Sequence, residues 1–168
     1  MMKFEFRKLD VSYTDGIMKI QDETFKGLPD SNLLRRNTRE MIESCLKEPN
    51  ITIGAFCNDE LAGFGVLYFP NEKAEELAPL VKSTDTVNLK SANFKLCIVR
   101  EKYRGNSLQY ELGIRIENEA VLHDCKIICA TVSPKNIYSR NNILRLGYEY
   151  DRTLEKYGLE RDLFFKIL

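Results

Sequence analysis

The sequence predicts a mixed α/β (α+β) fold, and three observations lead to this prediction. β-rich runs and amphipathic helical patterns follow one another in the order strand, two helices, three strands, helix, strand, helix and two strands. Two apolar runs near the middle are joined by a helical pattern, which is typical of a strand–helix–strand crossover. The 168 residues, 43% hydrophobic and 30% charged, are an ordinary globular mixture. No linker, repeat or low-complexity tract interrupts them, so we expect a single domain over residues 1–168.

The chain begins with a strand and two helices. Residues 3–9 alternate between charged and apolar side chains, as a half-buried strand does. Polar capping residues then lead into a helical pattern with one apolar face, which ends at the Gly-Leu-Pro-Asp sequence of residues 27–30. A second helical region ends near Lys47, just before a Pro-Asn pair.

Two further strands and an irregular segment follow. Residues 51–57 and 61–69 are β-rich and are separated by a hairpin-like turn. Residues 70–89 are a less regular insertion, in which residues 72–81 predict a helix and residues 82–88 a loop.

The next segment is the centre of the predicted fold. Residues 94–99 are an apolar strand, residues 100–103 are a short polar turn, and a helix begins at Gly105 or Asn106 and runs to Leu122. Apolar residues recur every four positions along this helix, which gives it one stripe to bury against a sheet.

The last third of the chain supplies one more strand, a helix and a hairpin. Residues 126–132 are an apolar run of the kind found in buried parallel strands. A helix is expected from about Asn136 to Leu146, and two strand-like runs follow at residues 148–156 and 159–167.

Charge and composition exclude several classes of protein. Lys plus Arg and Asp plus Glu both number 25, so no global attraction to nucleic acid or to an anionic membrane is expected. No apolar stretch is long enough to span a membrane, and the alternating N-terminus does not read as a signal peptide. Five cysteines without an export signal indicate free thiols in a reducing cytoplasm. We expect a cytoplasmic monomer or homodimer.

The turn before the central helix has the features of an anion site. The first amides of a helix lack partners inside it and lie at the positive end of its dipole. Gly105 allows close approach to the backbone, and Arg104 adds a cation. The pattern therefore predicts a phosphate or pyrophosphate cradle, and an ordinary strand-to-helix turn is the alternative. The glycine patterns of Walker loops and of dinucleotide-binding folds are both missing.

The residues around this turn resemble motif A of the GNAT superfamily of N-acetyltransferases, which usually reads Val-x-Pro-x-Tyr-Arg-Gly-x-Gly-Ile-Gly-x-x-Leu. The matching residues are Val99, Tyr103, Arg104, Gly105, Leu108 and Leu112. The chain departs from the motif at Glu101, Ser107 and Gln109, which replace a proline and two glycines. The core of the motif binds the pyrophosphate of acetyl-CoA. The resemblance implies a cofactor-binding set of Cys97, Ile98, Val99, Arg104, Gly105, Asn106, Ser107, Leu108 and Gln109.

A second GNAT motif is similar to residues 131–148, where its Asn, Ser and final Gly-aromatic pair match Asn136, Ser139, Gly147 and Tyr148. In the family the Asn contacts the pantetheine region of CoA, so Asn136 and Ser139 join the cofactor-binding set. Asn136 is also placed as a helix N-cap, and the two roles are compatible. The element order is that of the GNAT fold as well, which implies a mostly antiparallel central sheet with helices on both faces.

The catalytic residues stay unassigned. Ile143 takes the position of the general-acid tyrosine of many relatives, and Tyr138 is expected on another helix face. The inward positions of the motif-A strand are expected to hold residues such as Asn93, Lys95 and Cys97, none of them a carboxylate. Glu23 and Glu101 are best interpreted as exposed residues.

Backbone chemistry is the mechanism that the resemblance implies. In the family the motif-A strand splays from its neighbour, here the strand that begins at Lys126, and its last residues bind pantetheine through their backbone. An amide there can polarise the thioester carbonyl.

A covalent role for Cys97 and a metal site are both weaker interpretations. The only histidine, His123, lies at the far end of the helix, and a buried core cysteine is the common case. His123, Cys125 and Cys129 fit no standard zinc pattern, so no metal is expected.

The acceptor is not identified by the sequence. In the family layout residues 25–40 and 70–92 would form the acceptor rim. Its charged side chains are Glu72, Glu75, Glu76, Arg35, Arg36 and Arg39. The three arginines are expected on one solvated helix face.

The leading hypothesis is an N-acetyltransferase that moves an acetyl group from acetyl-CoA to a primary amine by direct attack in a ternary complex. The alternative is a catalytically impaired CoA-binding or protein-interaction module of the same fold. A different nucleotide-binding α/β protein is a third, weaker idea.

Overall fold

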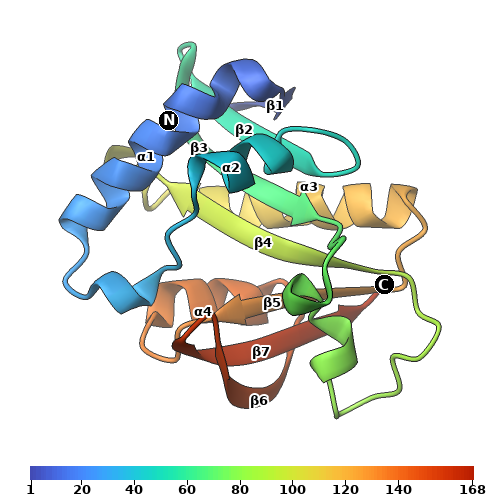
Figure 1. Cartoon of the computed structure of the whole chain (residues 1–168). Helices are drawn as coiled ribbons and strands as arrows, with labels where there is room; N and C mark the ends of the chain where they lie inside the picture. Colours follow the sequence, from blue (N-terminus) through green and yellow to red (C-terminus); the bar gives the residue numbers. More distant parts are fainter.

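The computed structural model describes all 168 residues and contains one sheet of seven strands in the order β1-β2-β3-β4-β5-β7-β6 (Figure 1). The strands are β1 (Glu5–Leu9), β2 (Ile51–Cys57), β3 (Glu60–Tyr68), β4 (Ser91–Val99), β5 (Ile127–Val132), β6 (Glu149–Lys156) and β7 (Leu159–Ile167). Every neighbouring pair is antiparallel except β4 and β5, which are joined by the crossover helix. The expected crossover and the mostly antiparallel sheet are therefore confirmed.

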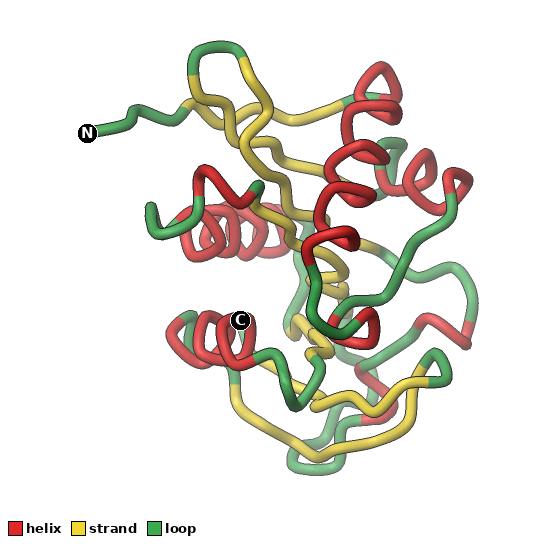
Figure 2. The backbone as a smooth tube through the Cα atoms, turned by 90° about the vertical axis from the view of Figure 1, so that its left-hand side faces the viewer, coloured by secondary structure: helices red, strands yellow, loops and turns green.

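Four helices cover the two faces of this sheet. They are α1 (Thr14–Gly27), α2 (Arg39–Cys45), α3 (Leu108–Leu122) and α4 (Ile137–Arg145). Ile17, Ile20 and Ile42 of the first two helices pack with residues of β2 to β4. The stripe of α3 and Ile143 of α4 pack on the opposite face, so the strands lie between two pairs of helices (Figure 2). Helices on both faces were predicted and are confirmed.

The irregular segment between β3 and β4 contains two short 3₁₀ helices, Lys73–Glu75 and Ala78–Leu80, in place of the predicted helix. Pro79 gives the reason, because it has no N–H to donate and its ring obstructs the preceding turn. The segment still contributes to the core. Leu77, Ala78 and Val81 cover the part of β5 and β7 that α1 and α2 leave open.

Two element boundaries also differ from the prediction. β4 begins at Ser91 rather than near residue 94. α3 begins at Leu108 rather than at Gly105 or Asn106, because Gly105 (φ +84°) and Ser107 (φ +57°) both have left-handed backbones. A right-handed helix cannot include residues in that conformation.

β4 and β5 stay together for only three residue pairs, Ser91 with Ile127, Ala92 with Ile128 and Asn93 with Cys129. They then separate, and Figure 1 shows β4 rising away from β5 toward the end of α1. This separation is the splay that the motif resemblance implied.

A bulge in β4 lies where the splay begins. Leu67 of β3 is opposite Phe94 and Val66 is opposite Leu96, so Lys95 is an extra residue in β4. The bulge reverses the alternation of side chains: Phe94 faces α3, whereas Leu96 packs on the side of α1. Asn93, Lys95 and Cys97 all border the gap between β4 and β5, as expected of the inward positions, but they do not share one face of the strand, because Cys97 packs against the core on the α3 side.

Candidate functional site

A cleft of about 1360 Å³ lies between the end of β4, the turn before α3 and the first turns of α4. The predicted cofactor-binding residues that line it are Cys97, Ile98, Val99, Arg104, Gly105, Ser107, Leu108, Gln109, Asn136 and Ser139. The two segments that resemble GNAT motifs, which are separated in the chain by most of α3 and by β5, therefore share one wall.

Asn106 is the predicted residue that does not line the cleft. Its side-chain Nδ2 donates to the carbonyl of Tyr103 at 2.9 Å and lies 3.4 Å from that of Arg104. The side chain of Asn106 therefore stabilises the turn through its Nδ2 and does not line the cleft.

The backbone of the turn is shaped to receive an anion. A Cβ at Gly105 would meet no atom within 4 Å, so open space lies above this residue. No backbone N–H from Gly105 to Gln109 has a partner in the chain. Ser107 is the N-cap of α3 and adopts φ +57°, which explains why a glycine suits this position in motif A.

Cations surround the turn. Arg104 lines the cleft, and its Nε lies 3.4 Å from the carbonyl of Val99. Arg145, at the end of α4, reaches across with Nη1 3.4 Å from Ser107 Oγ, and its guanidinium stacks 3.9 Å from the ring centre of Tyr110. Arg145 was missed because it falls at a position that the second motif does not specify. Its spacing of two helical turns from Tyr138 would have placed both on the same side of α4.

The start of α4 combines two roles. Asn136 Oδ1 accepts a hydrogen bond from the Ser139 amide at 3.2 Å, so Asn136 caps the helix as predicted. Both residues also line the cleft, which agrees with their place in the second motif. Ile143 is buried, with 4% of its surface exposed. Tyr138 lies at the rim of the cleft and is 88% exposed.

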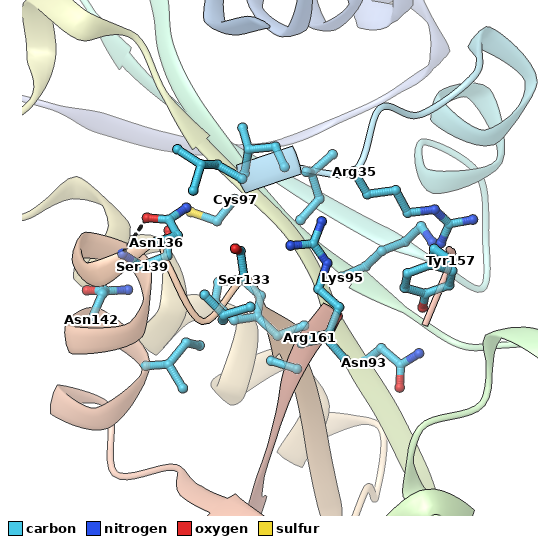
Figure 3. Close-up of a pocket in the computed structure, with 18 of the residues that line it drawn as sticks. Arg35, Asn93, Lys95, Cys97, Ser133, Asn136, Ser139, Asn142, Tyr157 and Arg161 are labelled. Atoms are coloured by element: carbon cyan, nitrogen blue, oxygen red, sulfur yellow. Dashed lines mark hydrogen bonds between the residues drawn. The ribbon is translucent and has the colours of Figure 1, made fainter. Parts of the chain in front are cut away.

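A second, inner pocket of about 100 Å³ lies in the gap between β4 and β5 and adjoins the cleft. Cys97, Gln109, Asn136 and Ser139 line both spaces. Figure 3 shows the other labelled side chains of this pocket, which come from the loop before α2, from β4, from the segment of β5 and α4, and from the β6–β7 hairpin. The separation of β4 from β5 thus connects the wide cleft with the small inner pocket.

Nothing in the surroundings of Cys97 activates its thiol as a nucleophile. Burial raises the pKa of its thiol to about 12, so the thiolate is scarce near neutral pH. All five cysteines are free, and no group of three or more potential ligands could hold a metal ion. His123 caps α3, and its Nδ1 lies 2.8 Å from the carbonyl of Glu119.

Glu75 does not itself line the inner pocket, but its two carboxylate oxygens bind cations that do. Arg35 contacts it twice, at 3.0 and 3.1 Å, and Lys95 Nζ lies 3.1 Å from Oε2. Burial favours a higher pKa for Glu75, but the two cations outweigh burial and lower the pKa to about 2. A carboxylate this acidic cannot serve as a general base near neutral pH. Because Arg35 and Lys95 already neutralise its charge, Glu75 would attract a cationic amine only weakly.

The predicted arginine cluster is wrong. Arg35, Arg36 and Arg39 do not share a helix face, since only Arg39 belongs to α2. Arg36 pairs with Asp22 at 2.8 Å, Arg39 pairs with Asp15, and Arg35 turns inward to Glu75. Glu23 is half exposed as expected, but it is held by Arg100 at 3.1 Å on the wall of the cleft.

Several solved structures have the same architecture as this chain. The chain superposes on Arabidopsis thaliana NAA60 in complex with acetyl-CoA, with a TM-score of 0.77, 16% identity and coverage of 99% of this chain and 100% of that one. This is the GNAT fold. An acetyltransferase of the GNAT family from Streptococcus pneumoniae has the same fold, with a TM-score of 0.71, 16% identity and coverage of 99% of both chains.

A third structure with the GNAT fold is the ribosomal-protein-alanine N-acetyltransferase from Brucella melitensis, with a TM-score of 0.73, 15% identity and coverage of 98% and 99%. No family model matches the sequence, and no curated protein matches it either. The likeness is therefore one of fold. None of the helices has the length and apolar character that a membrane span would need.

Proposed function

We propose that the protein is an acetyl-CoA-dependent N-acetyltransferase that acetylates a primary amine by direct attack in a ternary complex. The observation that carries the proposal is the opening between β4 and β5, with an anion cradle on one side and a small polar pocket on the other. The solved neighbour from Arabidopsis was determined with acetyl-CoA bound, which supports the choice of ligand.

The cradle fits a pyrophosphate. The unpartnered amides from Gly105 to Gln109 can donate to phosphate oxygens, and the space above Gly105 leaves room for them. Arg104 and Arg145 would balance the negative charge. Ser107 and Gln109, which replace motif glycines, leave this geometry intact because Ser107 adopts the left-handed backbone that glycine would have.

The splayed end of β4 would hold the pantetheine arm. Alternate backbone groups of a strand point to its two sides, and beyond Asn93 the side opposite β3 has no strand partner. We assign the pantetheine to these groups at Cys97, Ile98 and Val99, where an amide can polarise the thioester carbonyl. Asn136 and Ser139, which line the cleft at the start of α4, would face the same arm.

Attack by the amine forms the new C–N bond, and the C–S bond to CoA then breaks. Proximity and a polarised carbonyl supply most of what this chemistry needs. With Ile143 in place of tyrosine and Glu75 locked in ion pairs, we assign proton transfer to water.

Gly105→Glu tests the cradle. The bulky anion would occupy the space of the pyrophosphate, so we expect the affinity for acetyl-CoA, measured by titration calorimetry, to fall at least about 100-fold, or ~2.7 kcal/mol. Gly158→Glu is a matched control, since Gly158 also has a left-handed backbone (φ +71°) and open space in an exposed turn.

Micromolar binding by the wild type, followed by amine-dependent release of CoA, would support the enzyme. Binding without CoA release to any amine would favour a catalytically impaired CoA-binding module. Equal affinities for the wild type and a folded Gly105→Glu variant would contradict the assigned cradle.

A further inference from the structure

Arg161 of β7 is the most unusual charged residue of the inner pocket. Only 3% of its surface is exposed. Nη1 donates to the carbonyl of Asn32 at 3.2 Å, but Nη2 is buried and has no partner. No carboxylate lies within 4.0 Å of its guanidinium. Figure 3 shows Arg161 rising from its strand toward the middle of the pocket, with Ser133 nearby.

The pocket around Arg161 has more positive than negative charge. Three cations, Arg35, Lys95 and Arg161, line it, and one carboxylate, Glu75, is shared by the first two. Burial raises the pKa of Tyr157 to about 12, so its hydroxyl is neutral and supplies no counter-charge. Burial lowers the pKa of Arg161 below its usual value, and the Arg35 guanidinium acts in the same direction. A guanidinium nevertheless keeps its proton at neutral pH.

An unpaired buried cation is costly to a fold. A buried ion without a partner loses hydration that no group of the chain replaces. The hydrogen bond from Arg161 Nη1 to the carbonyl of Asn32 anchors the loop, but it gives no role to Arg161 Nη2. A ligand with a negative group in this pocket would supply the missing partner.

We propose that the acceptor is a small amino acid, whose carboxylate binds Arg161 Nη2 and whose amine points toward the β4 opening. This inference rests on the proposed acetyltransferase function and names the class of its acceptor. The pocket, at about 100 Å³, is small, and Cys97 and Gln109 at its inner edge also line the cleft for the acetyl donor.

A carboxylate fits this pocket better than a phosphate does. Both Nη atoms of Arg35 and the Nζ of Lys95 already bind Glu75, so among the cations that line the pocket Arg161 Nη2 is the buried donor without a partner. A phosphate group has three strong acceptor oxygens that each need a donor. One oxygen of a carboxylate can accept a hydrogen bond from Arg161 Nη2, and the other can accept one from water or from the Ser133 hydroxyl.

The test compares a panel of L-amino acids with their amides and their aminophosphonate analogues, using CoA release as the assay. We expect each accepted amino acid to exceed its amide at least 100-fold in kcat/KM. Arg161→Gln should remove that preference while changing the kcat/KM for amides less than 5-fold and the Kd for acetyl-CoA less than 2-fold. Arg161→Lys should restore part of the preference.

Arg152→Gln is the matched control. Arg152 of β6 also donates to a loop carbonyl, that of Leu80, but it lines neither the pocket nor the cleft. We expect it to leave the amino acid preference unchanged.

A second readout does not depend on catalysis. Propionate, a carboxylate without an amine, should raise the Tm of the wild type and of Arg152→Gln but not that of Arg161→Gln. Because Arg161 has no ion pair to lose, Arg161→Gln should fold with an unchanged or higher Tm.

The outcomes separate the two proposals. If acetyl-CoA binds but amides or phosphonates are acetylated as well as amino acids are, or propionate shifts the Tm of Arg161→Gln equally, the amino acid assignment is overturned and the acetyltransferase stands. If acetyl-CoA does not bind, the proposed function fails and the acceptor assignment fails with it.

Discussion

At the scale of single residues, Glu75 joins the segment between β3 and β4 to the rest of the molecule. Its carboxylate binds Arg35 from the loop before α2 and Lys95 from the bulge of β4. Its backbone carbonyl accepts from Asn93 Nδ2 at 2.7 Å. One side chain thus fixes three segments around the inner pocket.

Glu75→Gln should destabilise the protein at pH 7 by roughly 2–4 kcal/mol, because it leaves two cations without their partner. The pKa of Glu75 is about 2 in the folded protein against an ordinary value of 4.5, so its stabilising effect is complete above about pH 4.5. It is lost as the pH falls toward 2. Urea unfolding at pH 7 and at pH 3 should therefore show a smaller difference between wild type and variant at the lower pH.

Glu72→Gln is the control for this measurement, since Glu72 lies in the same segment, is exposed and forms no ion pair. A Glu75→Gln variant as stable as Glu72→Gln at pH 7 would contradict the role given to Glu75.

Sequence patterns were good at locating turns and helix caps and poor at locating charge partners. Gly105, Ser107 and Asn136 could be recognised because a turn and a helix cap are local. Arg161, Arg145 and Glu75 could not, because their roles depend on residues that are far away in the chain and meet only in the folded sheet. The basic cluster failed for the same reason: each arginine has its own distant or loop-bound carboxylate.

At the scale of elements, the packing of β3 on β4 is the tightest constraint near the site. A Cβ on Gly63 would lie 2.7 Å from the carbonyl oxygen of Ile98 and 3.1 Å from the Cα of Val99. Both are backbone atoms of the strand end assigned to the pantetheine arm, so the strands themselves would have to move.

Gly63→Ala should therefore destabilise the protein by ~1–3 kcal/mol, in the range found for overpacked cores. It should also weaken acetyl-CoA binding, because the displaced residues belong to the cleft wall. Chemical denaturation and calorimetry measure the two effects.

Gly16→Ala in α1 is the matched control for Gly63→Ala. Gly16 lies in the first turn of α1, and a Cβ added there would meet no atom within 4 Å. Alanine should therefore stabilise α1 by up to ~1 kcal/mol and leave binding unchanged. Equal stability for Gly63→Ala and Gly16→Ala would show that β3 and β4 can separate at little cost.

Helices and strands could be predicted wherever the hydrophobic residues kept the spacing of one element type without interruption. Each strand and each of the four helices was expected in the right order, since hydrophobic spacing decides these features. The failures came from backbone details. Pro79 broke a helix that composition favoured, and the bulge at Lys95 changed which side chains share a face.

At the scale of the whole molecule, the sheet consists of two parts joined by a short seam. β1 to β4 form one part and β5 to β7 the other, and three residue pairs hold β4 to β5. The cleft is lined from both parts, by the end of β4 and the turn before α3 on one side and by the start of α4 on the other.

A ligand that contacts both parts should stabilise them together. At a concentration of acetyl-CoA 100 times its Kd, the expected stabilisation is about 2.7 kcal/mol, or roughly 5–10 °C in Tm for a chain of this size. Hydrogen exchange should slow both at the end of β4 and at the start of α4. Protection confined to one of the two would contradict a ligand that spans the seam.

The bulge at Lys95 gives β4 one residue more than the facing stretch of β3. Deleting that residue would join Phe94 directly to Leu96 in a regular ladder, with Leu96 and Ile98 still toward α1 and Cys97 and Val99 still toward α3. The deletion would remove the ammonium that binds Glu75 and leave the order of the core side chains unchanged. For descendants of this sequence, losing the codon for Lys95 would therefore remove a cation from the inner pocket rather than rearrange the strand.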